Sequence, residues 1–423
     1  MPASHDSFDM ISFTESLISF LGSPAFHYSC LGASAIGLMG LALWRWRMYH
    51  TTLKALQTES QDVADAQQPL PKVSIVIPAY NEAAALEANL PRILRQEYNG
   101  QMEVIVVDEN STDDTASLIE RLQQDHHNLR STFIPSSARN IEYRKLALTL
   151  GIRASRAEWV VVMNADCEPL STTWLAHLAS RFTDDVDFVA AYINHDFDHT
   201  ASTRRSMFDR MLRQMQRYAA WRSGTVTGSE TANYAVRKSA FLSHQGFADS
   251  LCLPFGEECI YASHQVDPQR SVWLTGTGTA VCDAAPSAHY AQTLRIISSE
   301  TDRHLTPQAR RHAWQGRLSI LCSQLMLWST IIYTGIRLDH DCTLGLYSLT
   351  ALPTDIGMLF LALTALITPL CYMHRISALL QAPDFGWNLV GHTLLAPLRS
   401  LHIALLRYAH RAEFVRSYMV KEE

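Results

Sequence analysis

The stretch VSIVIPAYNE, residues 73–82, decides the fold that the sequence predicts. Its first five residues are mostly β-branched and apolar, which is typical of a buried strand, and the run ends at Pro78. The same pattern returns at 104–107, which is followed by Asp108, and again at 159–163. Three short apolar runs with polar residues directly behind them predict three buried strands.

Two stretches with the apolar spacing of helices, 87–96 and 115–124, separate these strands. The alternation of strand and helix predicts an α/β domain with a doubly wound parallel sheet, which we place at residues 71–315. Ligands of such sheets bind at the carboxyl ends of the strands, so the polar residues there are the first candidates for a site.

Composition narrows the function classes. The chain has 423 residues, of which 47% are hydrophobic and only 18% charged, against about a quarter in an ordinary soluble chain. The formal net charge of -6 argues against a nucleic-acid partner. The 8 cysteines include no CxxC pair, which favours reduced thiols over a disulfide framework.

Charged residues are scarce because several long stretches of the chain are almost entirely apolar. Such stretches indicate membrane segments. Residues 28–44 predict a transmembrane helix within an N-terminal segment 1–50, with a buried helix as the alternative. Two further spans, 318–336 and 356–373, are predicted within residues 316–375.

The remaining segments are predicted from polarity and spacing. Residues 51–70 are polar and read as a linker. Residues 376–423 carry apolar and basic residues at helical spacing, which predicts an amphipathic region lying on the membrane or packed on the domain.

Basic residues beside the predicted spans indicate on which side of the membrane the α/β domain lies. Arg45 and Arg47 follow the first predicted span, and Arg310, Arg311 and Arg317 precede the second. The positive-inside tendency then places the α/β domain in the cytoplasm. We therefore expect a multi-pass protein of the inner or plasma membrane that contacts the lipid bilayer, with membrane subunits as further candidate partners.

The loops after the first two strands supply candidate groups for binding a nucleotide sugar. Pro78, Tyr80 and Glu82 lie in the first loop, and Asp108 at the second strand end can accept hydrogen bonds from a base or ribose. Residues 111–115 supply helix-capping groups, so for their aspartates a structural role and a ligand role both stay open.

Cations and a third polar loop extend the site. Lys145 and Arg139 suit the phosphates of a sugar donor. After the third strand come Asn164, Ala165 and Asp166, of which Asp166 is the predicted ligand of Mg²⁺ or Mn²⁺ and Asn164 contributes only a neutral oxygen.

Two later motifs predict the acceptor side. Asn233 lies in a stretch of small residues and is a candidate contact for the acceptor sugar. Glu257 and Glu258 follow Gly256 and include a candidate general base for an inverting displacement. Acidic pairs are also common on surfaces.

A last motif contains Gln308, Arg311 and His312. Its cations could hold the donor diphosphate at the membrane interface, and the alternative is the ordinary basic flank of a span.

Together and in this order, from Val73 to His312, these motifs resemble the membrane-bound family 2 glycosyltransferases of the cellulose-synthase-like and hyaluronan-synthase-like group. The most specific parts are 73–82, 108–115, 145–155 and 164–175. The resemblance implies a GT-A fold, a nucleotide-diphosphate-sugar donor such as a UDP-sugar, and a hexosyltransferase (EC 2.4) that inverts configuration.

The resemblance also implies roles for individual residues. Asp108 matches the nucleotide-binding carboxylate, Asp166 the metal-binding aspartate of an Asp-x-Asp motif, and Glu258 the catalytic base. The Gln-x-x-Arg-Trp motif matches Gln308, Arg311 and His312.

The chain departs from the family pattern at three positions. Asn164 and Glu258 replace aspartates, and His312 replaces a tryptophan that is associated with holding a polymer. These departures favour transfer of one or a few sugars to a lipid-linked, glycan or membrane-associated acceptor. The alternative is a catalytically impaired homologue that acts as a membrane scaffold or regulator of polysaccharide synthesis.

Overall fold

The computed structural model describes residues 24–59, 70–135, 143–196, 200–228, 232–284, 288–344 and 351–379, and part of the stretch 390–405. The chain divides into two compact units. A helical unit comprises Met1–Arg47 with Leu318–Tyr372, and an α/β unit comprises Met48–Arg317 with Met373–Glu423.

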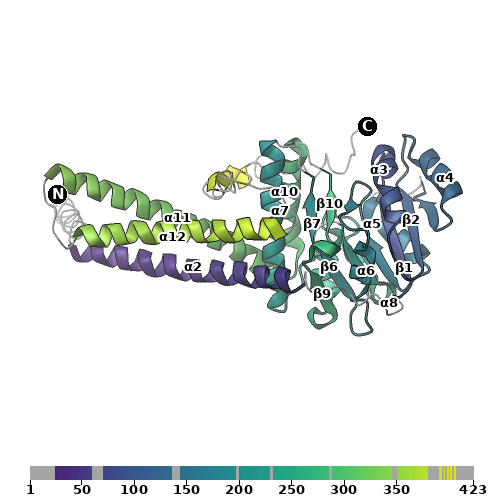
Figure 1. Ribbon diagram of the computed structural model, residues 1–423, viewed down its shortest axis with the longest axis horizontal. Helices are drawn as coiled ribbons and strands as arrows, with labels where there is room; N and C mark the ends of the chain where they lie inside the picture. Colours follow the sequence, from purple (N-terminus) through teal and green to yellow (C-terminus); the bar gives the residue numbers. More distant parts are fainter. Residues whose placement is uncertain are drawn as a thin grey trace, which may run out of the picture. The chain divides into compact units, whose positions relative to one another are not determined.

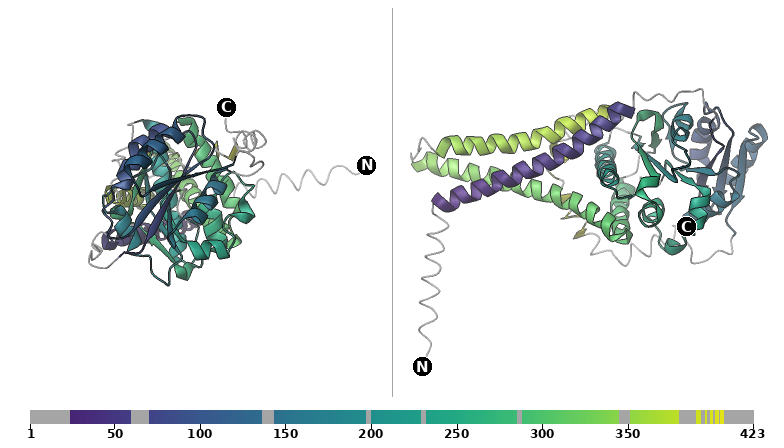
Figure 2. Two further views of the ribbon diagram at one scale, coloured as in Figure 1. Left: turned by 90° about the vertical axis from the view of Figure 1, so that its right-hand side faces the viewer. Right: turned by 90° about the horizontal axis from the view of Figure 1, so that it is seen from below.

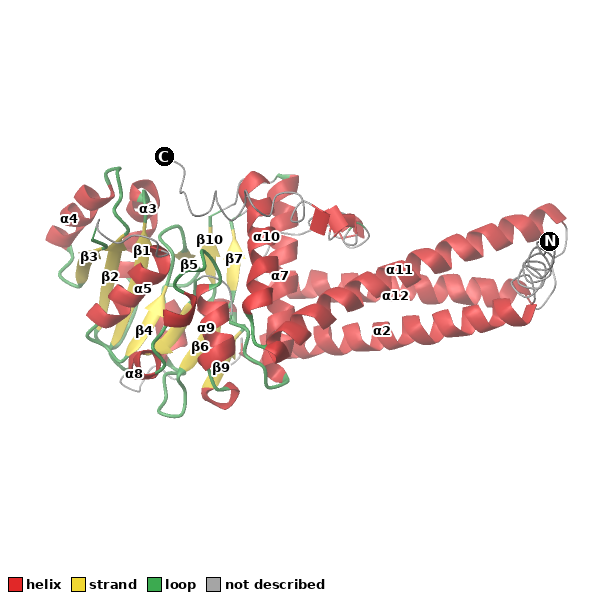
Figure 3. Ribbon diagram, turned by 180° about the vertical axis from the view of Figure 1, so that it is seen from behind, coloured by secondary structure: helices red, strands yellow, loops and turns green. Residues whose placement is uncertain are grey.

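A seven-stranded sheet forms the centre of the α/β unit (Figure 3), with the strand order β3-β2-β1-β4-β8-β6-β9. The strands are β1 (Val73–Ala79), β2 (Met102–Asp108), β3 (Leu129–Phe133), β4 (Trp159–Val162), β6 (Phe188–Ala191), β8 (Tyr234–Arg237) and β9 (Ser271–Leu274). Strand β1 pairs in parallel with β2 and with β4, and Ala79 is in register with Asp108. The carboxyl ends of β1, β2 and β4 therefore meet at one edge.

Helices cover both faces of this sheet. The helices of the α/β unit include α3 (Ala83–Leu94), α4 (Thr115–Asp125), α5 (Tyr143–Ala154), α6 (Trp174–Ala179), α7 (Ala201–Arg222), α8 (Lys238–Ser243), α9 (Glu257–Gln265) and α10 (Ala288–His304). Ile75 and Ile77 of β1 belong to one apolar core with Leu90 of α3, whereas Val76 belongs to a second core with Leu148 of α5. This alternation follows from the two-residue period of a strand.

The sheet is mixed, which corrects the prediction of a wholly parallel sheet. Strands β1 to β4 are parallel as predicted, but β8 is antiparallel to both β4 and β6. The apolar pattern of a strand reports its burial and not its direction. Direction depends on the route by which the chain returns to the sheet, and that route is not encoded locally.

A second sheet of three strands lies near the edge at which β1, β2 and β4 end. Its order is β5-β10-β7, with β5 at Glu168–Pro169, β7 at Ile193–His195 and β10 at Val281–Asp283. Cys282 of β10 pairs with Glu168 in antiparallel register. The end of β10 is thereby brought next to the segment that follows β4.

Three long helices supply the helical unit, and there they lie side by side (Figures 1 and 2). They are α2 (Pro24–Glu59), α11 (Pro307–Leu344) and α12 (Ala351–Leu379). Each exposes large apolar side chains at spacings of three and four, namely Ile36, Met39, Leu43 and Trp46 on α2, Leu325, Trp328 and Ile332 on α11, and Ile356, Phe360, Leu363 and Ile367 on α12. Each helix thus exposes an apolar stripe.

Among the described residues, no helix meets both the length and the apolarity that a membrane crossing demands. The stretches predicted as spans, 28–44, 318–336 and 356–373, are helical in the structure, but none of them is identified as a span.

The predicted linker needs a correction. Residues 51–59 continue α2 as helix, because Tyr49 and Leu53, four residues apart, are buried at 2% and 6% exposure and share one face. Residues 60–69 and most of the predicted C-terminal region 376–423 lie outside the described residues. Leu395, Leu398, Leu401 and Leu405 of that region are described and exposed.

Candidate functional site

Side-chain hydrogen bonds join the loops that follow β1 and β2. The main-chain N–H of Glu82 donates to Thr115 Oγ1 at 3.0 Å, and the N–H of Ala83 donates to Asp113 Oδ2 at 3.2 Å. Asp113 also accepts from the hydroxyl of Thr115 at 2.5 Å. Of the two roles left open for this aspartate, the structure shows the structural one.

Asp108 ends β2 at the edge where β1 also ends. Its Oδ1 accepts from the main-chain N–H of Ser111 at 3.0 Å, which fixes the carboxylate. Pro78 is buried within β1, and Tyr80 and Glu82 lie partly exposed just beyond it. The pairing of β1 with β2 thus brings together four residues that were predicted to bind the sugar donor.

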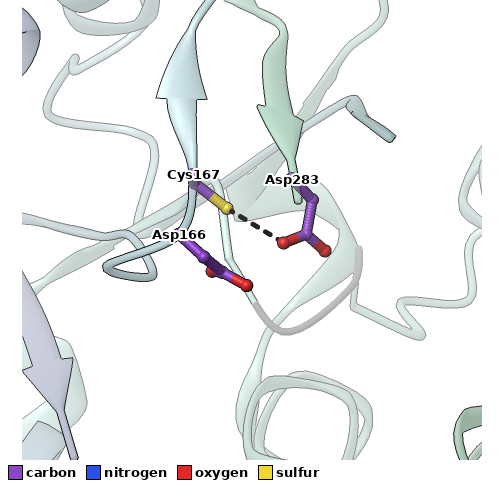
Figure 4. A group of neighbouring side chains, drawn as sticks. All are labelled: Asp166, Cys167 and Asp283. Atoms are coloured by element: carbon purple, nitrogen blue, oxygen red, sulfur yellow. Dashed lines mark hydrogen bonds between the residues drawn. The ribbon is translucent and has the colours of Figure 1, made fainter. Parts of the chain in front are cut away.

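Asp166 follows β4 and lies beside Asp283 at the end of β10 (Figure 4). Ligand atoms of Asp166, Cys167 and Asp283 lie within 4.8 Å of one another. Burial, followed by the charge and hydrogen bond of Asp283 and the charge of Glu82, raises the pKa of Asp166 to about 8. The proximity of Asp283 therefore opposes ionisation of both carboxyl groups at once.

Asp283 was not found from the sequence. Arg210 Nη2 donates to its Oδ2 at 2.7 Å, and the thiol of Cys167 donates to its Oδ1 at 3.7 Å. Burial, and then the charges of Asp283 and Asp166, raise the pKa of the Cys167 thiol. The available signal was the motif Val281–Asp283, another short apolar strand that ends in an aspartate.

Asp166 and Asp283 fit a divalent cation. Carboxylate oxygens are hard ligands that suit Mg²⁺ or Mn²⁺, and a cation would relieve the repulsion that raises the pKa of Asp166. A protonated thiol such as Cys167 is a poor ligand for these ions. The second carboxylate comes from Asp283, not from Asn164, which compensates for the charge that the sequence lacks at position 164.

Arg144 connects the two halves of the site and was also missed. Its Nε lies 2.8 Å from Glu257 Oε1, and its Nη2 donates to Asn164 Oδ1. The end of β4 is thereby joined to the acidic pair. Sequence reasoning chose the neighbouring Lys145, but successive positions on a helix point about 100° apart, so only one of the two faces the site.

Lys145 is corrected from a donor-binding residue to a structural one. Its side chain is 0% exposed, and Nζ donates to the carbonyl oxygens of Ser250, Leu253 and Phe255 at 2.7, 2.8 and 2.9 Å. An ammonium group has three N–H donors, and all three are used here. Lys145 therefore holds the loop that leads into α9.

Glu258 is the buried member of the acidic pair. Gly256, with φ +72°, makes the turn before α9, and Glu258 is 1% exposed. Its Oε1 accepts from the Cys259 thiol at 3.0 Å, and its Oε2 has no hydrogen-bond partner among the described residues. Burial and the charge of Glu257 raise the pKa of Glu258. Such a carboxylate is suited to taking a proton.

Asn233 is corrected from an acceptor contact to a core residue. Its Nδ2 donates to the carbonyls of Tyr192 and Thr279 at 2.7 and 2.8 Å, and its Oδ1 accepts from Trp174 Nε1 at 3.0 Å. The side chain is 0% exposed and joins three segments of the α/β unit.

The first turns of α11 carry Gln308, Arg311 and His312. Gln308 and Arg311 are exposed, whereas His312 is half-buried and lines a cavity. The structure shows no contact of Gln308 or Arg311 with Asp166 or Glu258 among the residues it describes, so their predicted donor contacts stay predictions.

Comparison with known families identifies the core of this unit. Residues 74–243 match the family described as "Glycosyl transferase family 2". These residues form a glycosyltransferase family 2 domain. The match supports the predicted enzyme class, and it covers β1, β2, β4 and the aspartates at 108 and 166.

Curated relatives match parts of the chain. A GalNAc(5)-diNAcBac-PP-undecaprenol beta-1,3-glucosyltransferase of Campylobacter jejuni is 36% identical over 61 residues, which are 14% of this chain and 19% of that protein. An undecaprenyl-phosphate 4-deoxy-4-formamido-L-arabinose transferase of Yersinia pestis is 28% identical over 186 residues, 42% of this chain and 50% of that protein. The chain thus spans at most half of the length of these two relatives.

Among solved structures, a mannosyltransferase of Pyrobaculum calidifontis in complex with GDP-Man and Mn²⁺ is similar with a TM-score of 0.50. The sequence identity is 20%, and the match covers 80% of this chain and 99% of that one. This similarity supports the predicted α/β fold of the GT-A type, with a mixed central sheet.

Proposed function

We propose that the chain is an inverting glycosyltransferase that moves a sugar from a nucleotide-diphosphate-sugar to an acceptor hydroxyl. One observation carries the proposal: Arg144 connects the segment that contains Asp166 to the acidic pair that contains Glu258. Asp166 follows Asn164 by two residues and is affected by the charge of Arg144, Arg144 joins Asn164 to Glu257, and Glu257 precedes Glu258 in the chain. A cation site and a general base are the two groups that such a transfer requires.

In the proposed reaction, Glu258 takes the proton of the acceptor hydroxyl. The hydroxyl oxygen forms a bond to the anomeric carbon on the face opposite the diphosphate, and the bond from that carbon to the diphosphate oxygen breaks. The electron pair stays on the nucleoside diphosphate, and the proton ends on Glu258. A single displacement of this kind inverts the configuration, and the raised pKa of Glu258 favours proton transfer to it.

On the donor side, Asp108 is the proposed partner of the base or ribose. A divalent cation held by Asp166 and Asp283 would neutralise the charge that develops on the departing diphosphate. Arg144 holds Asn164 and Glu257 in place between this site and Glu258.

On the acceptor side, we propose a lipid-linked or membrane-associated acceptor at the cytoplasmic face of the inner or plasma membrane. The names of both curated relatives include an undecaprenyl carrier. The apolar stripes on α2, α11 and α12 supply side chains that a bilayer would cover, and the basic residues Arg45 and Arg47 favour the cytoplasmic side.

Donor screening tests the proposal. The full chain, purified in detergent with Mn²⁺, is incubated with UDP-sugars and GDP-sugars, and nucleoside diphosphate release and the anomeric configuration of the product are measured. Release with one donor and an inverted product are expected. Retention of configuration would overturn the mechanism, and nucleotide binding without turnover of any donor would support the catalytically impaired alternative.

A further inference from the structure

Asp283, one of the two carboxylates that fit a cation, comes from a short strand. β10 has three residues, and it pairs with β7 over three positions and with β5 over two. Asp283 is the last residue of β10, so its carboxylate lies where the strand pairing ends. A cation site needs its ligands at fixed positions, and these require support from surrounding side chains. Contacts other than strand pairing must therefore hold Asp283.

Helix α7 supplies such contacts from one buried face. Arg210 and Gln214 are four residues apart and both are buried, so they point to the same side of the helix. Gln214 Nε2 donates to the carbonyl oxygen of Ile193 at 2.7 Å, and its Oε1 accepts from the N–H of Ile193 at 3.1 Å. Arg210 Nη1 donates to the carbonyl oxygen of Asn194 at 3.2 Å. The two side chains thereby hold β7, the strand with which β10 pairs in parallel.

The guanidinium of Arg210 also reaches the carboxylate itself. Its Nη2 donates to Asp283 Oδ2 at 2.7 Å, so one side chain binds the backbone of β7 and the side chain that ends β10. The other oxygen of Asp283, Oδ1, accepts from the Cys167 thiol at 3.7 Å (Figure 4). Arg210 thus fixes the carboxylate through the oxygen that the thiol does not contact.

The charge of Arg210 alone would oppose a cation at this place. Arg210 and Asp283 are both buried, and charges removed from water interact more strongly, so the guanidinium would repel a divalent cation. Hydrogen bonds to the groups that hold a metal nevertheless raise its affinity when they fix the orientation of those groups. The contacts of Arg210 with Asp283 and with β7 are of this orienting kind.

We propose that Arg210 is a positioning residue of the cation site, which holds the carboxylate of Asp283 beside that of Asp166 so that both face one divalent cation. The inference rests on the cation site of the proposed function. Arg210 acts through Asp283 and not on the donor or the reacting atoms. Its loss should therefore weaken cation binding only while the carboxylate of Asp283 is present.

Calorimetry with Mn²⁺ alone tests this role without any turnover. The Kd of Mn²⁺ is measured for the full chain in detergent, as wild type, Arg210→Gln and Arg210→Lys. Arg210→Gln is expected to bind Mn²⁺ about tenfold more weakly or worse, since loss of an orienting hydrogen bond costs roughly 10–100-fold in metal affinity. Arg210→Lys keeps the charge without the paired donors and should bind between wild type and Arg210→Gln.

The matched control is Arg222→Gln, which removes an exposed arginine from the end of the same helix. It is expected to bind Mn²⁺ like wild type. Equal affinity of Arg210→Gln and wild type overturns the proposal. Tighter binding by Arg210→Gln also overturns it, because that is the result of removing a repelling charge alone.

A double variant guards against a folding defect. Arg210→Gln leaves Asp283 as a buried charge without this partner, which destabilises a fold strongly, whereas Arg210→Gln with Asp283→Asn removes both charges. The double variant should bind Mn²⁺ with the same Kd as Asp283→Asn alone, because Arg210 acts through Asp283. A further loss of about tenfold in the double variant overturns the proposal. If Arg210→Gln does not fold, Arg210→Lys takes its place in the single comparison, and wild-type affinity in it overturns the proposal.

The same titrations separate this inference from the proposed function. Absence of Mn²⁺ binding by wild type would overturn the cation site, and the role of Arg210 with it. Binding by wild type with an unchanged Kd in Arg210→Gln would overturn the role of Arg210 alone. Since binding is read without chemistry, failure of the donor screen gives a third, different result.

Discussion

Glu258 has a carboxylate at 1% exposure, with one oxygen that has no hydrogen-bond partner among the described residues. A buried carboxylate without full hydrogen bonding is costly to ionise, and Glu257 next to it adds to the cost. Groups of this kind concentrate at functional sites, because a base must be able to accept a proton. The residue therefore combines a stability cost with the proposed catalytic role.

Replacing Glu258 with glutamine should separate these two effects. We expect Glu258→Gln to reduce kcat by about 100-fold or more, since a positioned general base contributes roughly that much. The assay is nucleoside diphosphate release with the donor identified by screening. Glu120→Gln, an exposed carboxylate on α4, is the matched control and should leave kcat unchanged. A similar kcat for Glu258→Gln and wild type would contradict the assignment.

The pH dependence of stability follows from the same pKa. The pKa of Glu258 is raised in the folded protein, so its favourable contribution is complete below its usual pKa and is lost as the pH rises through the raised value. Glu258→Gln cannot ionise, so relative to wild type its free energy of unfolding should be higher at about pH 8 than at about pH 4. Urea denaturation of both proteins at the two pH values measures this effect. If the free energies of unfolding of Glu258→Gln and wild type differed by the same amount at both pH values, the pKa of Glu258 would not be raised by folding.

Asp283 is the residue on which the proposed cation site most depends. We expect Asp283→Asn to weaken Mn²⁺ binding by about tenfold or more, because one of two carboxylates loses its charge. Titration calorimetry with Mn²⁺ alone measures the Kd. Glu120→Gln again serves as control. Unchanged Mn²⁺ affinity in Asp283→Asn would place the cation elsewhere.

At the scale of elements, two consecutive basic residues of α5 hold other segments of the site in place. Arg144 joins β4 to the start of α9, and Lys145 joins α5 to the loop before α9. Both side chains come from consecutive positions of one helix, yet one faces the site and the other is fully buried. The position of the acidic pair therefore depends on α5 as well as on α9 itself.

Lys145→Met should destabilise the protein instead of acting on donor binding alone. Three carbonyl oxygens of the loop 250–255 lose their donor, and each buried unsatisfied group costs about 1–3 kcal/mol, so a loss of about 3 kcal/mol or more is expected. Urea denaturation measures it, and Lys72→Met, at an exposed lysine, is the control. Unchanged stability with a raised KM for the sugar donor would restore the donor-binding interpretation.

At the scale of the whole molecule, the helical unit exposes three apolar stripes and the α/β unit contains the charged sites. Contiguous exposed apolar surface is typical of a protein that contacts a membrane or a partner. The proposed lipid-linked acceptor is itself a membrane component. The apolar stripes and the proposed acceptor thus both favour a protein that works at a membrane surface.

Flotation of the full chain with liposomes tests this environment. We expect the wild type to float with the liposomes, and a double variant with Ile356→Asp and Phe360→Asp to float less, since each charged side chain in an apolar layer costs about 2.5–3.5 kcal/mol. Leu242→Asp changes a less exposed leucine of the α/β unit and is the control. Wild-type protein that remains in the bottom fraction of the gradient, apart from the liposomes, would contradict the membrane proposal.

The sequence by itself determined the strands that carry the site and several of its groups. Runs of β-branched residues located β1, β2 and β4 to within a few residues, because burial on both faces leaves a local pattern. The polar residues after those runs correctly placed Asp108 and Asp166 at one edge. The pattern of Glu257 and Glu258 after a glycine marked the acidic pair.

Only the tertiary structure decided which side chains meet. Asp283 reaches Cys167 across 116 positions of the chain, and Arg144 reaches Glu257 from another helix. Lys145 and Asn233 have the residue types of ligand contacts, but their hydrogen bonds go to carbonyl oxygens and an indole of distant segments. The physical reason is that periodicity records whether a position is buried, whereas a hydrogen-bond partner depends on which distant segments the fold brings together.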